Sequence, residues 1–259
     1  MTKNQWFISI KKHEGDPFDL SNLKHNYPPE GMYWADPFLW QQDGIDYVFY
    51  ELYDYKKGVI AYSIINEDMS FSEPKVIMDY APHLSYPFLF EDNGTLYMIP
   101  ESGQAHHIAL HKCVSFPDKW EFDKILVNCQ SGDNNIFVDN GRYFMYTTIQ
   151  PNLRHELCIL TAESLHGPWY GVMQENIDNS RSGGKVWKQD DIIYRACQIG
   201  KGGYGNGIQI KAMSLDLETE RYGEKVVHEI KPNWHPELTG THHIDWNDKY
   251  MVIDGKRKI

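Results

Sequence analysis

The sequence predicts an all-β fold, a five-bladed β-propeller, and two observations support this prediction. A pattern of about fifty residues recurs along the chain, and a repeat of three or four antiparallel strands over roughly 40 to 50 residues is typical of a propeller blade. Aromatic residues make up 14% of the chain, and aromatic side chains favour strands. We expect one propeller domain over residues 1–259, since propellers often reach this length as a single unit.

The recurring unit is a short apolar strand, a turn of the Asp-Gly or Asn-Gly kind, and a second strand with aromatic alternation. Glycine and asparagine supply the positive φ angles that tight hairpin turns require. Another alternating run follows each hairpin and predicts a third strand. The copies span residues 36–51, 86–101, 133–148, 183–198 and, more loosely, 243–255.

The fifth copy stops after its second strand and therefore lacks an outer strand. The N-terminal segment 5–11 has the apolar alternation of a strand. We expect this segment to pair with the last copy and close the ring, because such pairing removes two exposed strand edges.

Charge and composition narrow the ligand classes. The formal net charge is −11, which disfavours nucleic acid and anionic membrane surfaces as partners, because both require a basic face. No apolar stretch has the length of a signal peptide or a membrane span, so we expect a cytoplasmic protein. The four cysteines are widely spaced without a Cys-x-x-Cys pair, so we expect neither a zinc site nor a dense disulfide framework. We also expect no bound metal and no cofactor.

The ends of the inner strands indicate where the chemistry lies. In a propeller the first strand of each blade lines the central channel, and the second strand returns to the same face. Residues that open first strands and close second strands are therefore expected around one mouth, where binding groups concentrate. These positions include Asp36, Glu51, Tyr86, Glu101, Asp133 and Gln198.

Asp36 is the sharpest of these candidates. It precedes a proline in the apolar strand Tyr-Trp-Ala-Asp-Pro-Phe, and an unpaired buried carboxylate is costly. We expect hydrogen bonds or a cavity around it, the alternative being an aspartate that caps a turn. For Asp133 the alternative is ordinary turn chemistry, and for Glu51 and Glu101 it is ion pairing with Arg195 or lysines.

The fourth copy is basic and rich in glycine. Arg181 and Lys185 open it, Arg195 lies on its second strand, and Tyr204 lies in the glycine-rich loop 202–207. Guanidinium, ammonium and unhindered backbone N–H groups suit an anion such as phosphate. The loop matches no nucleotide-binding fingerprint.

The fifth copy adds His242, His243 and Asp254. A metal site is the alternative to substrate binding here. Adjacent residues in a strand point to opposite faces, so we expect at most one of the two histidines to face the mouth.

Several segments resemble known families. Ala-Asp-Pro-Phe at 35–38, the five copies and Asp133 resemble the five-bladed propellers of glycoside hydrolase family 43. The segments Leu-Ser-Tyr-Pro-Phe at 84–88 and Tyr-Arg-x-x-Gln at 194–198, with Asp254-Gly255, are similar to the N-terminal domains of glucosamine inositolphosphorylceramide transferases and their bacterial relatives.

The family 43 resemblance implies a base at Asp36, an orienting acid at Asp133, and a general-acid glutamate on the fourth copy. The fourth copy opens with Arg-Ser-Gly-Gly instead, so this acid is absent, and Glu101 is the candidate substitute. A transferase that uses a phosphate-activated sugar needs no such acid, because a phosphate departs readily once its charge is neutralised.

We therefore expect a glycosyltransferase of bacterial surface polysaccharide or glycoconjugate biosynthesis, with Asp36 as general base. Its partners are a nucleotide- or phosphate-linked sugar donor, with the phosphate near Arg181, Lys185 and a histidine, and a glycan acceptor. The alternatives are a family 43-like hydrolase that uses Asp36, Asp133 and Glu101, and a non-catalytic sugar-binding propeller.

Overall fold

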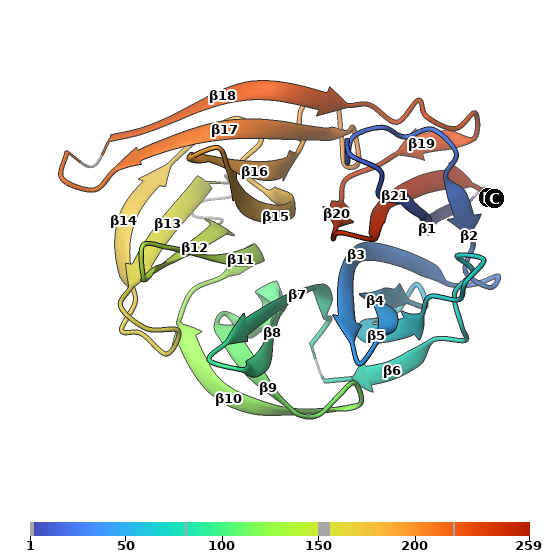
Figure 1. Cartoon of the computed structure of the whole chain (residues 1–259), viewed down its shortest axis with the longest axis horizontal. Helices are drawn as coiled ribbons and strands as arrows, with labels where there is room; N and C mark the ends of the chain where they lie inside the picture. Colours follow the sequence, from blue (N-terminus) through green and yellow to red (C-terminus); the bar gives the residue numbers. More distant parts are fainter. Residues whose placement is uncertain (1–2, 81, 150–155, 220) are drawn as a thin grey trace.

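The computed structural model describes residues 3–80, 82–149, 156–219 and 221–259. Strands dominate these residues, and a short 3₁₀ turn lies at Gly103–Ala105. The strands form three four-stranded sheets and one nine-stranded sheet. Figure 1 shows them arranged around a common centre, with β3, β7, β11, β15 and β20 on the inner side.

Each four-stranded sheet follows the chain in order from the centre outwards. The first sheet contains β3 (Tyr33–Gln42), β4 (Ile45–Tyr53), β5 (Gly58–Ile64) and β6 (Lys75–Met78). The second contains β7 (Ser85–Asp92), β8 (Thr95–Glu101), β9 (Ile108–Ser115) and β10 (Lys119–Val127). The third contains β11 (Ser131–Asp139), β12 (Arg142–Ile149), β13 (Glu156–Ala162) and β14 (Tyr170–Glu175).

The nine-stranded sheet joins the fourth sequence copy to the fifth. Its first part contains β15 (Ser182–Gln189), β16 (Ile192–Gln198), β17 (Ile208–Asp216) and β18 (Arg221–Ile230). Its second part contains β20 (Ile244–Trp246), β21 (Tyr250–Lys258), β1 (Asn4–Lys12) and β2 (Lys24–Asn26), and β19 (Leu238–Gly240) pairs with β21.

The two parts of this sheet meet in one parallel residue pair, Gly184 and Ile244. Separate blades were expected at this point. A Cβ atom on Gly184 would lie 2.2 Å from the carbonyl oxygen of Ile244. The glycine therefore lets the two inner strands approach closely enough to pair.

The N-terminal strand lies between β21 and β2. β1 pairs antiparallel with β21 from Asn4 opposite Lys258 to Lys12 opposite Tyr250. The pairing expected between segment 5–11 and the last sequence copy is thus present in the structure.

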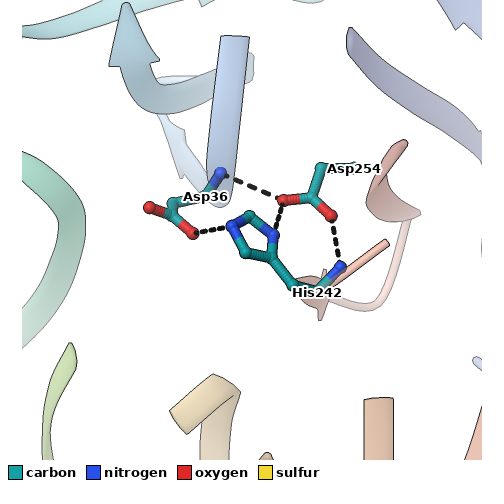
Figure 2. A group of neighbouring side chains, drawn as sticks. All are labelled: Asp36, His242 and Asp254. Atoms are coloured by element: carbon teal, nitrogen blue, oxygen red, sulfur yellow. Dashed lines mark hydrogen bonds and ion pairs between the residues drawn. The ribbon is translucent and has the colours of Figure 1, made fainter. Parts of the chain in front are cut away.

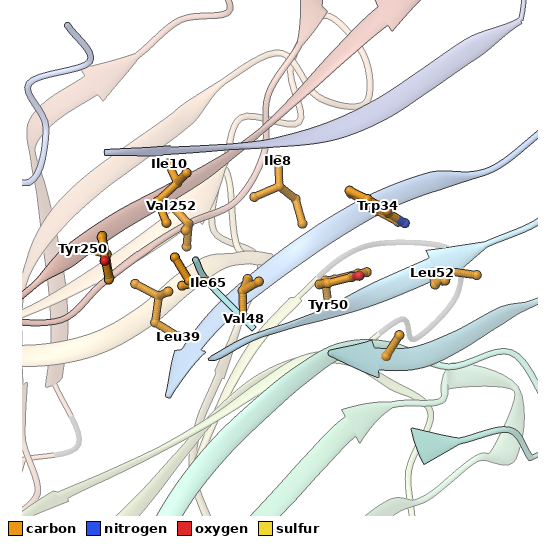
Figure 3. Packing of buried hydrophobic residues seen from close by; sticks show 11 residues of the cluster. Ile8, Ile10, Trp34, Leu39, Val48, Tyr50, Leu52, Ile65, Tyr250 and Val252 are labelled. Atoms are coloured by element: carbon orange, nitrogen blue, oxygen red, sulfur yellow. The ribbon is translucent and has the colours of Figure 1, made fainter. Parts of the chain in front are cut away.

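Apolar packing fixes this strand against the first sheet (Figure 3). Ile8 from β1 and Val252 from β21 are fully buried in one cluster with Trp34, Val48 and Tyr50 from the first sheet. Burial of large apolar side chains is the main stabilising contribution in such a contact. The cluster holds β3 and β21 side by side, and these strands carry Asp36 and Asp254.

Among the described residues, none forms a helix with the length and apolar character needed to cross a bilayer.

Candidate active site

A β-bulge recurs on three inner strands and carries one predicted site residue on each. The register shifts between Ala35 and Phe38 on β3, and equivalent shifts occur on β7 and β11. Asp36, Tyr86 and Asp133 lie in these bulges with φ angles of 53°, 47° and 52°. Positive φ is uncommon outside glycine, and a bulge redirects the side chain it carries. The bulge therefore sets the direction of these three side chains.

On one side of the mouth, Asp254 holds His242 against Asp36 (Figure 2). Asp254 Oδ1 accepts the backbone N–H groups of His242 at 2.8 Å and His243 at 3.0 Å. Asp254 Oδ2 pairs with His242 Nδ1. The opposite ring nitrogen of His242, Nε2, lies 3.7 Å from Asp36 Oδ1. Asp254 thus orients the imidazole so that Nε2 faces Asp36.

Two aromatic side chains complete this arrangement. The Trp6 ring from β1 stacks on the His242 ring with centroids 4.2 Å apart. The hydroxyl group of Tyr204 lies 2.6 Å from His242 Nε2. The N-terminal strand and the glycine-rich loop therefore both contribute to the position of His242.

Burial and charge set the protonation of these groups. Asp36 is only 4% exposed, and burial raises its pKa well above the ordinary value although His242 opposes the shift. For His242, burial lowers the pKa, but Asp254 and Asp36 outweigh it and the pKa is raised. In the described part of the chain, histidines but no lysine or arginine lie within ion-pairing distance of Asp36. Asp36 is therefore a carboxylate that readily takes up a proton.

On the other side of the mouth, Arg181 joins two carboxylates. Its Nε and Nη2 atoms donate to Asp133 at 2.5 and 3.2 Å. Its Nη2 also donates to Glu101 at 3.1 Å. Gln198 donates to Asp133 at 2.8 Å, and Ser85 donates to Glu101 at 2.9 Å. Arg181 is therefore a counter-charge shared by two acids.

This arrangement separates the pKa values of the two acids. Burial, aided by Glu101, raises the pKa of Asp133 to about 7 although Arg181 opposes the shift. Burial also acts to raise the pKa of Glu101, but Arg181, Asp133 and Ser85 outweigh it and the pKa is lowered. Glu101 is thus an ionised group and a poor proton donor.

The structure also contains a carboxylate–histidine pair, Glu51 and His83, that the sequence did not reveal. The buried carboxylate of Glu51 lies 2.9 Å from His83 Nε2, and the Gly58 N–H group donates to His83 Nδ1 at 3.0 Å. This bond leaves the His83 proton on Nε2, the atom that faces the Glu51 carboxylate. His83 lies in the connection before the second copy, so the repeat alignment did not reveal it.

The two histidines contradict the expectation that at most one faces inward. His243 Nδ1 also lies 3.7 Å from Asp36 Oδ1. The expectation is wrong because residues 242 and 243 lie between β19 and β20 rather than within a strand. His243 is fully buried, and its ring packs against the rings of Phe38 and Tyr86.

Three other predicted site residues form their polar contacts with groups other than Asp36, Asp133 and Glu101. Arg195 is buried and pairs with Glu224 at 2.5 Å. Lys185 lies 3.3 Å from Asp245 and over the Trp246 ring. The Tyr86 hydroxyl donates to the Gly184 carbonyl at 2.8 Å.

These placements bear on the anion site expected in the fourth copy. Lys185 and Arg195 each have an acidic partner elsewhere, and Arg181 is held by Asp133 and Glu101. The described residues therefore do not assemble the expected cluster of free cations.

The residues best placed to hold a metal ion are Asp36, His242 and Asp254, whose ligand atoms lie within 4.8 Å of one another. The oxygens of Asp254 already accept two backbone N–H groups and face His242 Nδ1. Asp254 would therefore act as the residue that orients a histidine ligand. The absence of a metal, expected from the sequence, stays a prediction.

Solved structures of carbohydrate enzymes share this arrangement of sheets. A family 117 glycoside hydrolase from Zobellia galactanivorans superposes with a TM-score of 0.60 at 12% identity, covering 99% of this chain and 92% of that chain. An α-L-arabinanase from Cellvibrio cellulosa gives 0.56 at 13% identity, covering 75% and 77%. The chain thus has the all-β propeller fold of these glycoside hydrolases.

The family itself follows from the sequence match. Residues 21–248 match the family described as glucosamine inositolphosphorylceramide transferase 1, N-terminal, and the chain belongs to this family. The transferase of this name from Arabidopsis thaliana is 29% identical over 203 residues, and the one from Oryza sativa subsp. indica is 28% identical over 216 residues. These matches cover 73% and 76% of this chain but 26% and 29% of the relatives. The resemblance predicted from the sequence is confirmed, and the chain spans little more than a quarter of its curated relatives.

Proposed function

We propose that this chain is a carbohydrate-active enzyme, a glycosyltransferase that takes a phosphate-activated sugar and uses Asp36 as general base. The observation that carries the proposal is the environment of Asp36, which is buried, has a raised pKa and faces an oriented histidine. A general base works best when its pKa lies near the operating pH. The curated relatives are named as transferases, which supports transfer as the reaction.

In the proposed reaction, Asp36 removes the proton from an acceptor hydroxyl group. The acceptor oxygen attacks the anomeric carbon, and the bond from that carbon to the phosphate oxygen breaks with its electron pair on the phosphate. The expected lysine and arginine partners are engaged elsewhere. His242 is therefore the group that offers positive charge or a proton to the leaving phosphate, since its pKa is raised.

A family 43-like hydrolase with Asp36, Asp133 and Glu101 is the second candidate, and the shared fold favours it. Hydrolysis of a glycosidic bond requires a proton donor for the leaving oxygen. Arg181 lowers the pKa of Glu101, which weakens Glu101 in that role. A non-catalytic sugar-binding propeller is the third candidate.

We also infer the finer architecture and setting. We infer that the nine-stranded sheet comprises two blades linked by the bridge at Gly184, which would give five blades in one domain over residues 1–259. We further infer that the pairing of β1 with β21 serves to close the ring. We place the protein in the cytoplasm, where activated sugars are made, and in bacterial surface polysaccharide or glycoconjugate biosynthesis. The net charge of −11 supports a role without nucleic acid.

A panel of nucleotide sugars tests the proposal. We expect one of them to raise the thermal unfolding temperature and to release its nucleotide in the presence of a glycan acceptor. Asp36→Asn should bind the same donor without turnover. If no nucleotide sugar stabilises the protein and aryl glycosides are cleaved in a way that depends on Asp36, the reaction is hydrolysis instead. Glycan binding that survives loss of every mouth carboxylate would establish a binding protein.

A further inference from the structure

A small cavity lies beside the cluster of Arg181, Asp133 and Glu101. It has a volume of about 70 Å³ and is bounded by the ends of β8, β11 and β12 and by the Arg181 side chain. Among its lining residues, Gln130, Ser131 and Thr148 have uncharged polar side chains. None of the described residues that line the cavity is aromatic, so these residues are suited to polar contacts rather than to stacking.

One wall of the cavity holds an unsatisfied polar group. Thr148 is 2% exposed, and its hydroxyl oxygen has no hydrogen-bond partner among the described residues. Most buried hydroxyl groups are hydrogen-bonded, so an exception requires a reason. A ligand group in the cavity would supply the missing partner.

Two glycines keep the space around Glu101 open. A Cβ atom on Gly103 would lie 3.4 Å from Glu101 Oε1, and one on Gly132 would lie 3.8 Å from the same atom. Gly132 is also the cross-strand partner of Thr148. A methyl group at Gly132 would therefore occupy space between Thr148 and the carboxylate without a backbone clash.

The charged side chains around the cavity and the volume of the cavity indicate which chemical groups it can bind. Glu101 and Arg181 form an ion pair, so a free anion or a free ammonium group would have to displace one of them. A neutral hydroxyl group donates to a carboxylate and accepts from a guanidinium at the same time. A cavity needs only about 10–15 Å³ of such volume to hold one water molecule, so this cavity has room for a small substituent of a sugar.

We propose that this cavity receives one uncharged hydroxyl-bearing substituent of a sugar, such as a hydroxymethyl group, and selects the sugar by it. The inference rests on the proposed carbohydrate function and deepens it. Thr148 and Glu101 contact the substituent, and Gly132 leaves the room for it. Asp36 remains the reacting group on the other side of the mouth.

Saturation-transfer NMR with a panel of methyl hexopyranosides and their 6-deoxy analogues tests this inference. We expect the protein to bind at least one hexopyranoside and to bind its 6-deoxy analogue at least tenfold more weakly. Thr148→Val should weaken binding of the parent sugar about tenfold and leave the 6-deoxy analogue unchanged, whereas Thr148→Ser should restore the preference. Gly132→Ala should abolish binding of the parent sugar.

Gly171→Ala is the matched control. Gly171 lies on the outer strand β14, and a Cβ atom there meets nothing within 4 Å, so this variant should bind like the unchanged protein. Circular dichroism checks that each variant is folded. Equal binding by Gly132→Ala, Thr148→Val and the unchanged protein overturns the inference. So does the absence of binding across the panel, whereas the nucleotide-sugar assay with Asp36→Asn decides the proposed function separately.

Discussion

The two sides of the mouth hold their carboxylates in different ways. On one side, Asp254 orients His242, and its imidazole faces Asp36. On the other side, the permanent charge of Arg181 is shared between Asp133 and Glu101. A histidine gains and loses a proton near neutral pH, whereas an arginine does not. The side with Asp36 and His242 is therefore suited to proton transfer. The side with Arg181 is suited to stabilising the charges of Asp133 and Glu101 and to fixing their positions.

Asp36→Asn should give the largest effect, because it removes the proton acceptor on the first side. We expect turnover to fall by about 10³-fold, within the range for loss of a general base. The free energy of unfolding should stay equal or rise, because a buried charge is removed. Product formation and urea denaturation measure the two quantities. Full turnover in this variant would refute the role of Asp36.

Asp254→Asn tests whether the orientation of His242 matters. The amide would present N–H to His242 Nδ1 and shift the imidazole proton to Nε2. We expect kcat to fall about 10²-fold and the pH profile to change on its basic side, while donor affinity is kept. An unchanged pH profile would show that Asp254 has only a structural role.

Arg181→Gln tests the second side through stability. It leaves Asp133 and Glu101 close together without their shared cation, and breaking a buried pair typically costs 3–5 kcal/mol. Because the Arg181 side chain is 30% exposed, we expect a loss of about 2–3 kcal/mol in the free energy of unfolding. The double variant Arg181→Gln/Asp133→Asn should recover part of it, and no recovery would contradict the shared charge.

Asp133→Asn sharpens the comparison through pH. The pKa of Asp133 is raised to about 7 from an ordinary value of 3.8, so the folded protein keeps a proton that the unfolded chain releases. The contribution of Asp133 to the free energy of unfolding therefore falls as pH rises from 4 to 7. Denaturation across this range should show Asp133→Asn gaining stability relative to the unchanged protein. A constant difference would rule out the raised pKa.

Tyr204→Phe should give the smallest effect. The Tyr204 hydroxyl bonds to His242 Nε2, but the residue is 55% exposed. We expect a change of less than about 1 kcal/mol in the free energy of unfolding and a few-fold change in turnover. A larger loss of turnover would place Tyr204 in the proton path with His242.

The sequence predicted the fold and the positions of the acidic site residues more fully than it predicted which residues pair with those acids. Hairpin turns and alternation are local patterns, and the turns at Asp43-Gly44, Asn93-Gly94 and Asn140-Gly141 have the expected positive φ angles. Which cation pairs with which acid depends on contacts between distant strands, so Arg181 was expected to bind substrate phosphate. Arg195 and Gln198 lie on β16 an odd number of residues apart, and such side chains point to opposite faces of a strand. The sequence alone therefore indicates that Arg195 points away from the side on which Gln198 contacts Asp133.

The pairing of β1 with β21 also orders the folding of this chain in time. Hairpins such as β3–β4 can form as soon as their own residues leave the ribosome, because they join neighbours in sequence. Residues 4–12 must wait for residues 250–258. Until then the apolar face of β1 lacks its final partner, and Asp36 and His242 are not yet held together. Asp36 and His242 are therefore brought into their final positions only after residues 250–258 have been synthesised.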